Sequence, residues 1–277
     1  MTAIGWVAAA ELSYFGSEKA LAIVNGKIAA ADPDGLSIGL YDTSASQSPG
    51  TTGMWAVVNR TANSGFCVGN TKGKWLANSA TADLSPFANT LTENGTVTSG
   101  VVNTSTDLLG YSGFSTSNYL SRAYDADLDF GTADFSVITW LKTGTMSAFG
   151  TIYNFATTAY ANAYTQFTGN ASGELRFLIS DGTGSDTVTT TGFEIDDDVW
   201  HMVGFVCDGG GATNKIYVDG ALIASGTRAE GSLSNGSAVL GIGEDTRTNN
   251  TPWPGSLSLL RASASAPSAA QVRAMYE

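Results

Sequence analysis

The stretch that decides the fold is residues 199–226, VWHMVGFVCDGGGATNKIYVDGALIASG. Residues 200–207 form an apolar run without proline, which predicts a strand. The Asp-Gly-Gly-Gly run at 208–211 ends this strand, because glycine adopts the positive φ angles that tight turns need. Residues 215–218 resume extended structure, and Asp219-Gly220 is the two-residue signal of a β-hairpin. The stretch therefore predicts consecutive antiparallel strands.

Two strands of this region are predicted to lie at the centre of a sheet. The strand at 200–207 is apolar on both faces, which indicates that one face lies in the core and the other is covered. Residues 135–142, FSVITWLK, alternate between two faces. One face carries Phe135, Val137, Thr139 and Leu141, and the other carries Ser136, Ile138, Trp140 and Lys142.

The chain is predicted to hold two β-rich regions. In residues 1–88 an apolar run at 20–24 ends at Asn25-Gly26, a type I′ hairpin signal, and residues 36–41 alternate with period two. We interpret this region as a small β-rich attachment or assembly module, followed by a linker, and residues 89–277 as the main domain. The main domain ends in a short helix, since Ser268 and Gln271 form a capping box.

Three separated motifs of residues 90–277 resemble the laminin-G-like, concanavalin-A-like jelly-roll domain. They are D-F-S-V with Trp140, then W-H-x-V followed by Y-V-D-G at 200–220, then G-x-L-x-x-L-R and P-S-A-x-Q-V-x-x-x-Y at 255–276. The resemblance does not cover residues 1–88. It implies an all-β fold in which a two-sheet jelly-roll sandwich follows the small N-terminal β module and ends in the short helix.

Composition excludes several classes of partner. Acidic residues outnumber basic ones 25 to 13, giving a net charge of −12, and there is no basic run, so we expect no nucleic-acid partner. The acidity serves solubility or cation binding. No apolar stretch is long enough for a membrane span, so no membrane insertion is expected, and the N-terminus lacks the pattern of a signal peptide.

The cysteine and histidine content limits the chemistry further. Cys67 and Cys207 both lie in apolar contexts, so they are either buried free thiols or one long-range disulfide. His201 is the single histidine, so the chain cannot assemble a histidine-based triad, and we interpret His201 as a structural residue.

The segment Glu194-Ile195-Asp196 suggests an enzymatic role, that of a glycan hydrolase. The segment resembles the start of the E-[IL]-D-x-x-E motif of concanavalin-A-like glucanases. In that motif alternate strand residues place the catalytic acids on one face. Here the last acidic position holds Val199, so the general acid/base is missing. The sequence therefore predicts a protein that is not an enzyme, with a glycan hydrolase using Glu194 and Asp196 as the third hypothesis.

Binding sites are predicted on loops. Aromatic platforms beside polar residues suit carbohydrate, and Tyr160, Asp181 and Trp253 are the predicted glycan-binding residues. Calcium is the one cofactor suggested, because it prefers several oxygen ligands and laminin-G-like modules often hold one on an edge loop. The predicted calcium ligands are Asp181, Asp208 and Asp245.

The leading functional hypothesis is a bacteriophage virion structural protein, such as a tail fibre or another exposed component. Charged residues are only 14% of the chain, and a surface built from Ser, Thr, Asn and Gly is common in virion proteins. The expected partners are other virion proteins, further copies of this chain and a host-surface glycan, and the expected location is the virion. The alternative is a bacterial surface or secreted adhesin or carbohydrate-binding module, at the cell surface or outside the cell.

Overall fold

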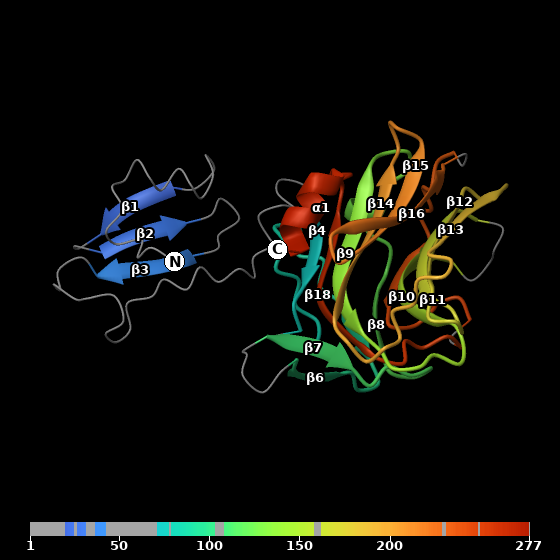
Figure 1. Cartoon of the computed structure of the whole chain (residues 1–277), viewed down its shortest axis with the longest axis horizontal. Helices are drawn as coiled ribbons and strands as arrows, with labels where there is room; N and C mark the ends of the chain where they lie inside the picture. Colours follow the sequence, from blue (N-terminus) through green and yellow to red (C-terminus); the bar gives the residue numbers. More distant parts are fainter. Residues whose placement is uncertain are drawn as a thin grey trace. The chain divides into compact units, whose positions relative to one another are not determined.

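The computed structural model of the chain (Figure 1) describes residues 20–24, 27–31, 37–42, 71–77, 79–102, 108–157, 162–228, 231–248 and 250–276. The chain divides into two compact units, residues 1–69 and 70–277. Residues 70–88, which the sequence assigned to the first region, thus belong to the second unit.

The first unit contains a three-stranded antiparallel sheet. Its strands are β1 (Ala20–Val24), β2 (Lys27–Ala31) and β3 (Ser37–Asp42), in the order β1-β2-β3. Val24 pairs with Lys27, and the predicted turn residues Asn25 and Gly26 lie outside the described residues.

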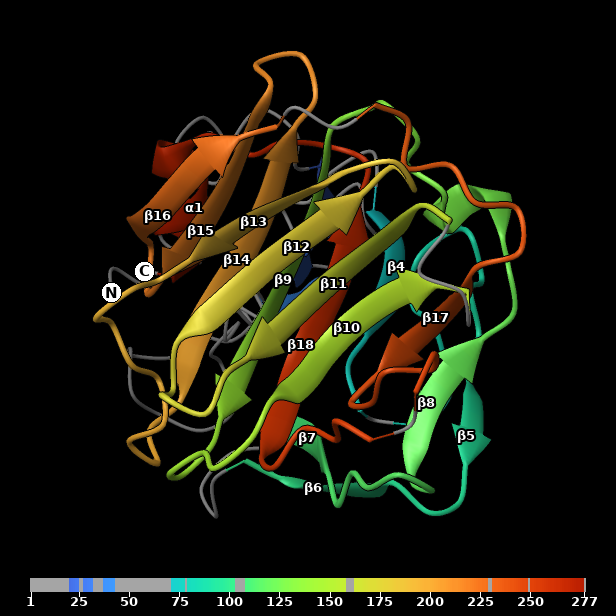
Figure 2. The ribbon, with the colours of Figure 1, turned by 90° about the vertical axis from the view of Figure 1, so that its right-hand side faces the viewer.

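The second unit is a sandwich of two antiparallel sheets, which confirms the predicted jelly-roll class (Figures 1 and 2). The seven-stranded sheet has the order β13 (Ser185–Thr189), β12 (Leu175–Ser180), β11 (Tyr164–Gly169), β10 (Gly150–Ala156), β17 (Val239–Ile242), β8 (Tyr119–Arg122) and β5 (Thr92–Asn94). The eight-stranded sheet has the order β16 (Ala221–Thr227), β15 (Thr213–Val218), β14 (His201–Asp208), β9 (Phe135–Lys142), β18 (Ser256–Ser263), β7 (Leu109–Ser112) and β6 (Thr98–Val101), and β4 (Thr71–Trp75) pairs with β18.

The core between the sheets is built around aromatic rings from both of them. Phe167 of β11 stacks on Phe205 of β14, with ring centroids 4.4 Å apart. Phe177 of β12 meets Phe167 edge-on at 4.8 Å, and Phe135 of β9 packs against Phe177. Each aromatic pair contributes about 0.5–1.5 kcal/mol beyond the burial of its apolar area.

The fold-deciding stretch forms β14, β15 and β16 in the predicted order. Asp219 and Gly220 have φ angles of 49° and 78°, as a type I′ turn requires. The glycine run acts differently from the prediction, because the residue there with a positive φ is Ala212. Gly209 is needed for space instead, since a Cβ on it would lie 2.4 Å from the backbone oxygen of Thr132.

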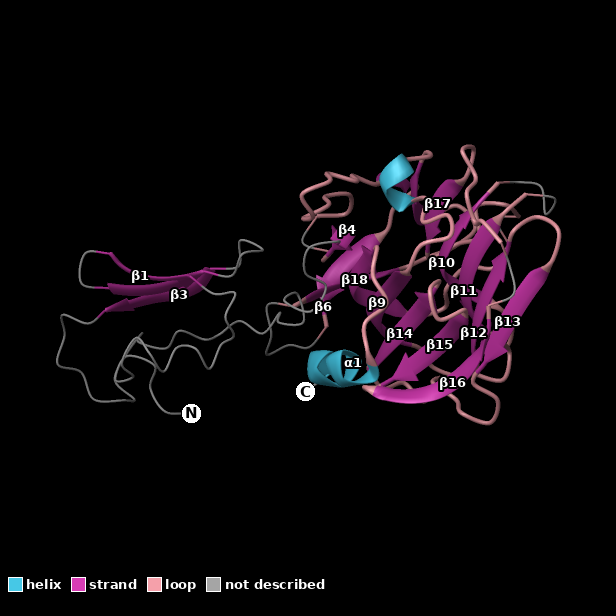
Figure 3. Cartoon of the chain, turned by 90° about the horizontal axis from the view of Figure 1, so that it is seen from above, coloured by secondary structure: helices cyan, strands magenta, loops and turns pink. Residues whose placement is uncertain are grey.

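The short helices of the described residues lie at opposite places in the unit (Figure 3): η4 (Ala126–Leu128) follows β8, and α1 (Ala269–Tyr276) ends the chain. The capping box is present, because Ser268 N–H donates to Gln271 Oε1 and Gln271 N–H donates to Ser268 Oγ. The helix covers the outer face of β9 and β14, where Tyr276 stacks on Trp140 with 5.9 Å between ring centroids. Val272 of the helix faces β14, since a Cβ on Gly204 would lie 3.9 Å from its Cγ1, and this cover explains why β14 is apolar on both faces. No helix in the described part of the chain is long and apolar enough to cross a membrane.

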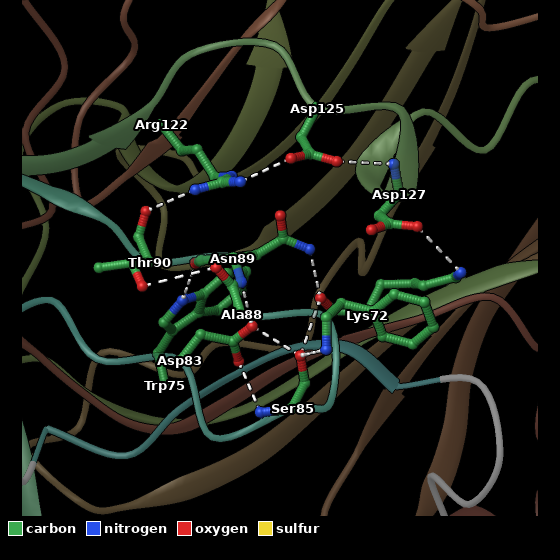
Figure 4. A network of polar contacts seen from close by, with 11 residues as sticks. Lys72, Trp75, Asp83, Ser85, Ala88, Asn89, Thr90, Arg122, Asp125 and Asp127 are labelled. Atoms are coloured by element: carbon green, nitrogen blue, oxygen red, sulfur yellow. Dashed lines mark hydrogen bonds and ion pairs between the residues drawn. The ribbon is translucent and has the colours of Figure 1, made fainter.

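A polar network ties residues 71–91 to the sandwich (Figure 4). The Asp83 carboxylate accepts hydrogen bonds from the backbone N–H groups of Lys74 at 2.7 Å, Ser85 at 2.8 Å and Asn89 at 2.6 Å. The Trp75 indole, buried in the core, donates to Asn89 O at 3.0 Å. These bonds order the segment itself. The pairing of β4 to β18, the Lys72 Nζ–Asp127 Oδ1 contact at 3.3 Å and the bond from Arg122 Nη1 to Thr90 O at 2.9 Å join it to the second unit.

Candidate functional site

The outer face of the seven-stranded sheet is the candidate binding surface (Figure 2). Side chains alternate along a strand, so Phe177 of β12 points into the core and its neighbours Arg176 and Leu178 point outward. Arg176 pairs with Thr168 of β11 and with Thr189 of β13. This row of side chains crosses three neighbouring strands near the start of β12 and the ends of β11 and β13.

Residues 243–248 and 250–254, which we call the cover segment, close one half of this face. Asp245 accepts hydrogen bonds from Asn154 Nδ2 at 3.1 Å and Gln166 Nε2 at 3.0 Å, on β10 and β11. Arg247 donates two hydrogen bonds to the same carboxylate, from Nε to Oδ1 at 2.9 Å and from Nη2 to Oδ2 at 2.7 Å. The side chains of Arg247 and Asp245 are only 2% and 3% exposed. The Arg247 guanidinium also lies 4.6 Å above the Tyr164 ring.

The cover segment is anchored at two further places. Glu244 is buried, and its Oε1 accepts the N–H groups of Asp245 at 2.7 Å and Thr251 at 2.8 Å. Burial raises the pKa of Glu244, against the opposing effect of these two hydrogen bonds. Trp253 is buried where β10 and β11 carry glycines: a Cβ on Gly150 or Gly169 would lie 3.1 or 3.2 Å from its ring.

The other half of the face, over β12 and β13, is open. Phe149, just before β10, is 45% exposed, and the Arg176 guanidinium carbon lies 5.2 Å from the centre of its ring. Leu178 and Thr189 are half-buried beside Arg176, and Thr187 is exposed. We call Phe149, Arg176, Leu178, Thr187 and Thr189 the open patch. It combines an aromatic ring, a planar cation and hydroxyl groups.

Two of the predicted glycan-binding residues, Asp181 and Trp253, lie within the described residues. Asp181 lies in a turn outside the open patch, and Trp253 is buried. Asp181 holds a turn: its Oδ1 accepts the Thr183 hydroxyl at 2.7 Å and the Thr183 N–H at 2.8 Å, and its Oδ2 accepts Gly231 N–H at 3.2 Å. These bonds, the Thr183 hydroxyl first, lower the pKa of Asp181. Trp253 is buried, as described, and Tyr160 lies outside the described residues. Their glycan contacts stay predictions.

The three predicted calcium ligands do not converge. Asp208 accepts Gly211 N–H at 2.6 Å and faces Lys215 Nζ at 3.3 Å, while Asp181 and Asp245 have the separate partners given above. Within the described ranges, no three His, Cys, Asp or Glu side chains group as a metal site. Each carboxylate is already satisfied by N–H groups or a cation, so the three form no common calcium cage, and calcium binding stays a prediction.

The acids considered for hydrolysis lie off the sheet. Glu194 and Asp196 belong to the loop between β13 and β14, where Glu194 is exposed and Asp196 accepts the Met146 N–H at 2.9 Å. Because they lie in a loop, they do not occupy alternate positions of one strand, the arrangement by which the glucanase motif presents its acids together.

His201 is a structural clamp, and Cys207 is a buried free thiol. His201 Nδ1 lies 2.7 Å from Asp219 Oδ2, and Nε2 lies 3.1 Å from Asp197 Oδ1. Burial lowers the pKa of His201, but the hydrogen bonds with Asp219 and Asp197 outweigh it and the pKa is raised. Burial raises the pKa of the Cys207 thiol to about 11, and Arg228 Nη1 donates to its sulfur at 3.2 Å.

Sequence reasoning missed the two residues that define the open patch. Arg176 falls on the outward position of an alternating strand, LRFLIS, which is a signal for a solvent-facing charge. No local pattern could show that Phe149 lies beside it, because β10 and β12 meet only through β11.

Comparison with known proteins places the fold. A family model described as the concanavalin A-like lectin/glucanases superfamily matches residues 114–273. This match covers more than half of the chain, and the protein belongs to this superfamily. No curated protein matches the sequence.

Solved structures share the fold at low identity. The binding domain of Paraclostridial Mosquitocidal Protein 1 superposes with a TM-score of 0.61 at 14% identity, covering 75% of this chain and 52% of that one. Domain 4 of AbnA, an extracellular arabinanase of Geobacillus stearothermophilus solved with arabinotriose, has a TM-score of 0.58 at 16% identity, covering 75% and 98%. The ligand-binding domain of botulinum neurotoxin serotype D, solved with N-acetylneuraminic acid, has 0.57 at 13%, covering 76% and 52%. The chain thus spans about half of the two toxin domains.

Proposed function

We propose that the jelly-roll unit binds carbohydrate through the open patch and catalyses no reaction. The observation that carries this proposal is the exposed Phe149 ring with the Arg176 guanidinium beside it, on a sheet face whose other half is closed. An aromatic ring receives the C–H face of a sugar, and nearby polar groups fix its hydroxyls. Thr189 and Thr187 supply hydroxyl groups beside Arg176 and Leu178, with which they pair.

The same face argues against hydrolysis. A glycosidase needs two carboxyl groups on either side of the bond that it cleaves. Glu244 and Asp245 of the cover segment are both buried, and Asp245 is paired with Arg247. Glu174, two residues before Arg176, is held by the Gly192 N–H and by Asn170 Nδ2, and it is a single carboxylate rather than one of a facing pair. Two of the similar structures, solved with arabinotriose and with N-acetylneuraminic acid, give further support for a sugar-binding role.

The test is a glycan array with the full chain, followed by calorimetry on the saccharides that bind. Phe149→Ala should weaken binding about tenfold or more, as expected for a central aromatic contact. Leu222→Ala is the matched control, because Leu222 is 48% exposed on the other sheet and its loss should leave binding unchanged. A chain that binds no glycan, or a Phe149→Ala variant that binds normally, contradicts the proposal.

The proposed setting is an exposed virion component of a bacteriophage, acting as a homo-oligomer at the host surface. The support is the low charge content and the division of the chain into an N-terminal unit and a jelly-roll unit. Electron microscopy of purified particles with an antibody against this chain tests the virion setting, and light scattering tests the oligomer. Labelling of bacterial cells instead of particles favours the adhesin alternative.

A further inference from the structure

The guanidinium of Arg176 is uncommitted, unlike those of the other arginines whose contacts are resolved. Arg122 donates to Thr90 O at 2.9 Å and pairs with Asp125 at 2.5 Å. Arg247 is paired with Asp245, and Arg228 donates to backbone oxygens of the neighbouring loops. Within the described residues the Arg176 side chain makes no hydrogen bond or ion pair, and its ring contact with Phe149 leaves its N–H donors available.

The position of Arg176 is also fixed. The residue lies inside β12, which is paired on one side with β11 and on the other with β13. Stacking on Phe149 restricts the guanidinium plane further. A donor group held in place loses less freedom when it binds a ligand than a flexible surface lysine does.

We infer that the open patch selects saccharides that carry a carboxylate, and that Arg176 binds this group with two parallel hydrogen bonds. The inference rests on the proposed function and names its ligand class. A guanidinium presents a planar pair of donors that matches the two oxygens of a carboxylate. Phe149 and Leu178 would contact the sugar ring next to the carboxylate. The hydroxyls of Thr187 and Thr189 would contact the polar edge of that ring.

The surrounding charges favour a single negative charge over a doubly charged phosphate. Glu174 lies two residues before Arg176 on the same side of the strand, and its oxygens are held by Gly192 N–H at 2.7 Å and Asn170 Nδ2 at 2.9 Å. The hydrogen bond from Gly192 and the one from Asn170 lower the pKa of Glu174, so it is ionised at neutral pH. With a net charge of −12 on the chain, attraction comes from local contact with Arg176 rather than from the overall field.

The experiment compares matched pairs of ligands on the full chain by calorimetry: trigalacturonate with its methyl ester, and 3′-sialyllactose with its methyl ester. Esterification removes the charge and keeps the sugar. In at least one pair the acid should bind about 10- to 100-fold more tightly, the range expected for hydrogen bonds to a charged group. Arg176→Gln should abolish the difference and keep the weaker binding of the ester. Arg176→Lys should recover part of the difference, because it restores the charge without the planar fork.

Lys142→Gln is the matched control, since it removes one positive charge from the other sheet, where Lys142 pairs with Asp198. This variant should bind the acids as the wild type does. If acid and ester bind equally in both pairs, or if Arg176→Gln keeps the preference, the inference fails while the proposed function stands. If no saccharide of any kind binds, both fail together.

Discussion

Replacing Asp245 with alanine removes the carboxylate that anchors the cover segment. The change takes the counter-charge from Arg247, whose side chain is 2% exposed, and the acceptor from the amides of Asn154 and Gln166. Removing one partner of a buried ion pair destabilises a protein by about 3–5 kcal/mol. For a unit of this size each 1 kcal/mol lowers the melting temperature by roughly 2–4 °C, so we expect a decrease of about 6–20 °C.

Two measurements separate global from local loss of stability. Thermal unfolding followed by circular dichroism reports the whole unit, whereas trypsin cleavage after Arg247 reports opening of the cover segment alone. If the segment opens before the unit unfolds, Asp245→Ala shows a smaller change in melting temperature and much faster cleavage. Either result confirms that the Asp245 carboxylate holds the cover closed.

The control is Asp198→Ala, which breaks the pair with Lys142. The Asp198 side chain is 75% exposed, and exposed ion pairs contribute about 0–1 kcal/mol. An Asp245→Ala variant that melts within a few degrees of Asp198→Ala and resists trypsin like the wild type would refute the reasoning. The outer face of the sheet would then not be closed by this segment.

Three further predictions concern other parts of the unit. The pKa of His201 is raised in the folded state, so the contacts of protonated His201 stabilise the fold below the unfolded pKa of about 6.5, and this stabilisation is lost as the pH rises through the folded pKa. In urea unfolding, His201→Gln should therefore lower the free energy of unfolding more at pH 5.5 than at pH 9. An equal loss at both pH values would contradict the clamp. Asp83→Ala should lower the free energy of unfolding by more than about 2 kcal/mol, since three backbone N–H groups lose their acceptor, and a loss below about 0.5 kcal/mol in chemical denaturation would overturn this account. If calcium binds at the three predicted carboxylates, millimolar calcium raises the melting temperature, and an unchanged value ends that prediction.

The fold could be predicted from the sequence where the signals are local. Asp219-Gly220 is a turn because both positions need positive φ, and β9 shows its two faces by simple alternation. The boundary between the units was harder to predict, because the segment 71–91 is short and polar, and many of its side chains are small. What holds them is the pairing of β4 with β18, nearly two hundred residues away in sequence, and the network around Asp83.

The candidate site could not be predicted from local sequence patterns either, because it also depends on contacts between residues that are distant in sequence. Trp253 lies in a polar stretch, and that context predicts an exposed ring; the glycines at 150 and 169 that accommodate it are distant in sequence. The sequence predicts Asp245 as a calcium ligand, but it does not show that the guanidinium of Arg247, two residues later, pairs with this carboxylate. The contact of Phe149 with Arg176 depends on the register of three strands, which periodicity alone does not specify.

Mapping the position of a bound saccharide tests the central claim most directly. Amide chemical-shift changes, recorded on the full chain during titration with trigalacturonate and 3′-sialyllactose, should concentrate on Phe149 and on β11, β12 and β13, and in Arg176→Gln they should need a higher ligand concentration to appear. Changes centred on Trp140 of the opposite sheet and Tyr276 of α1, or no changes with any saccharide that the chain binds, would contradict the assignment of the open patch as the binding site.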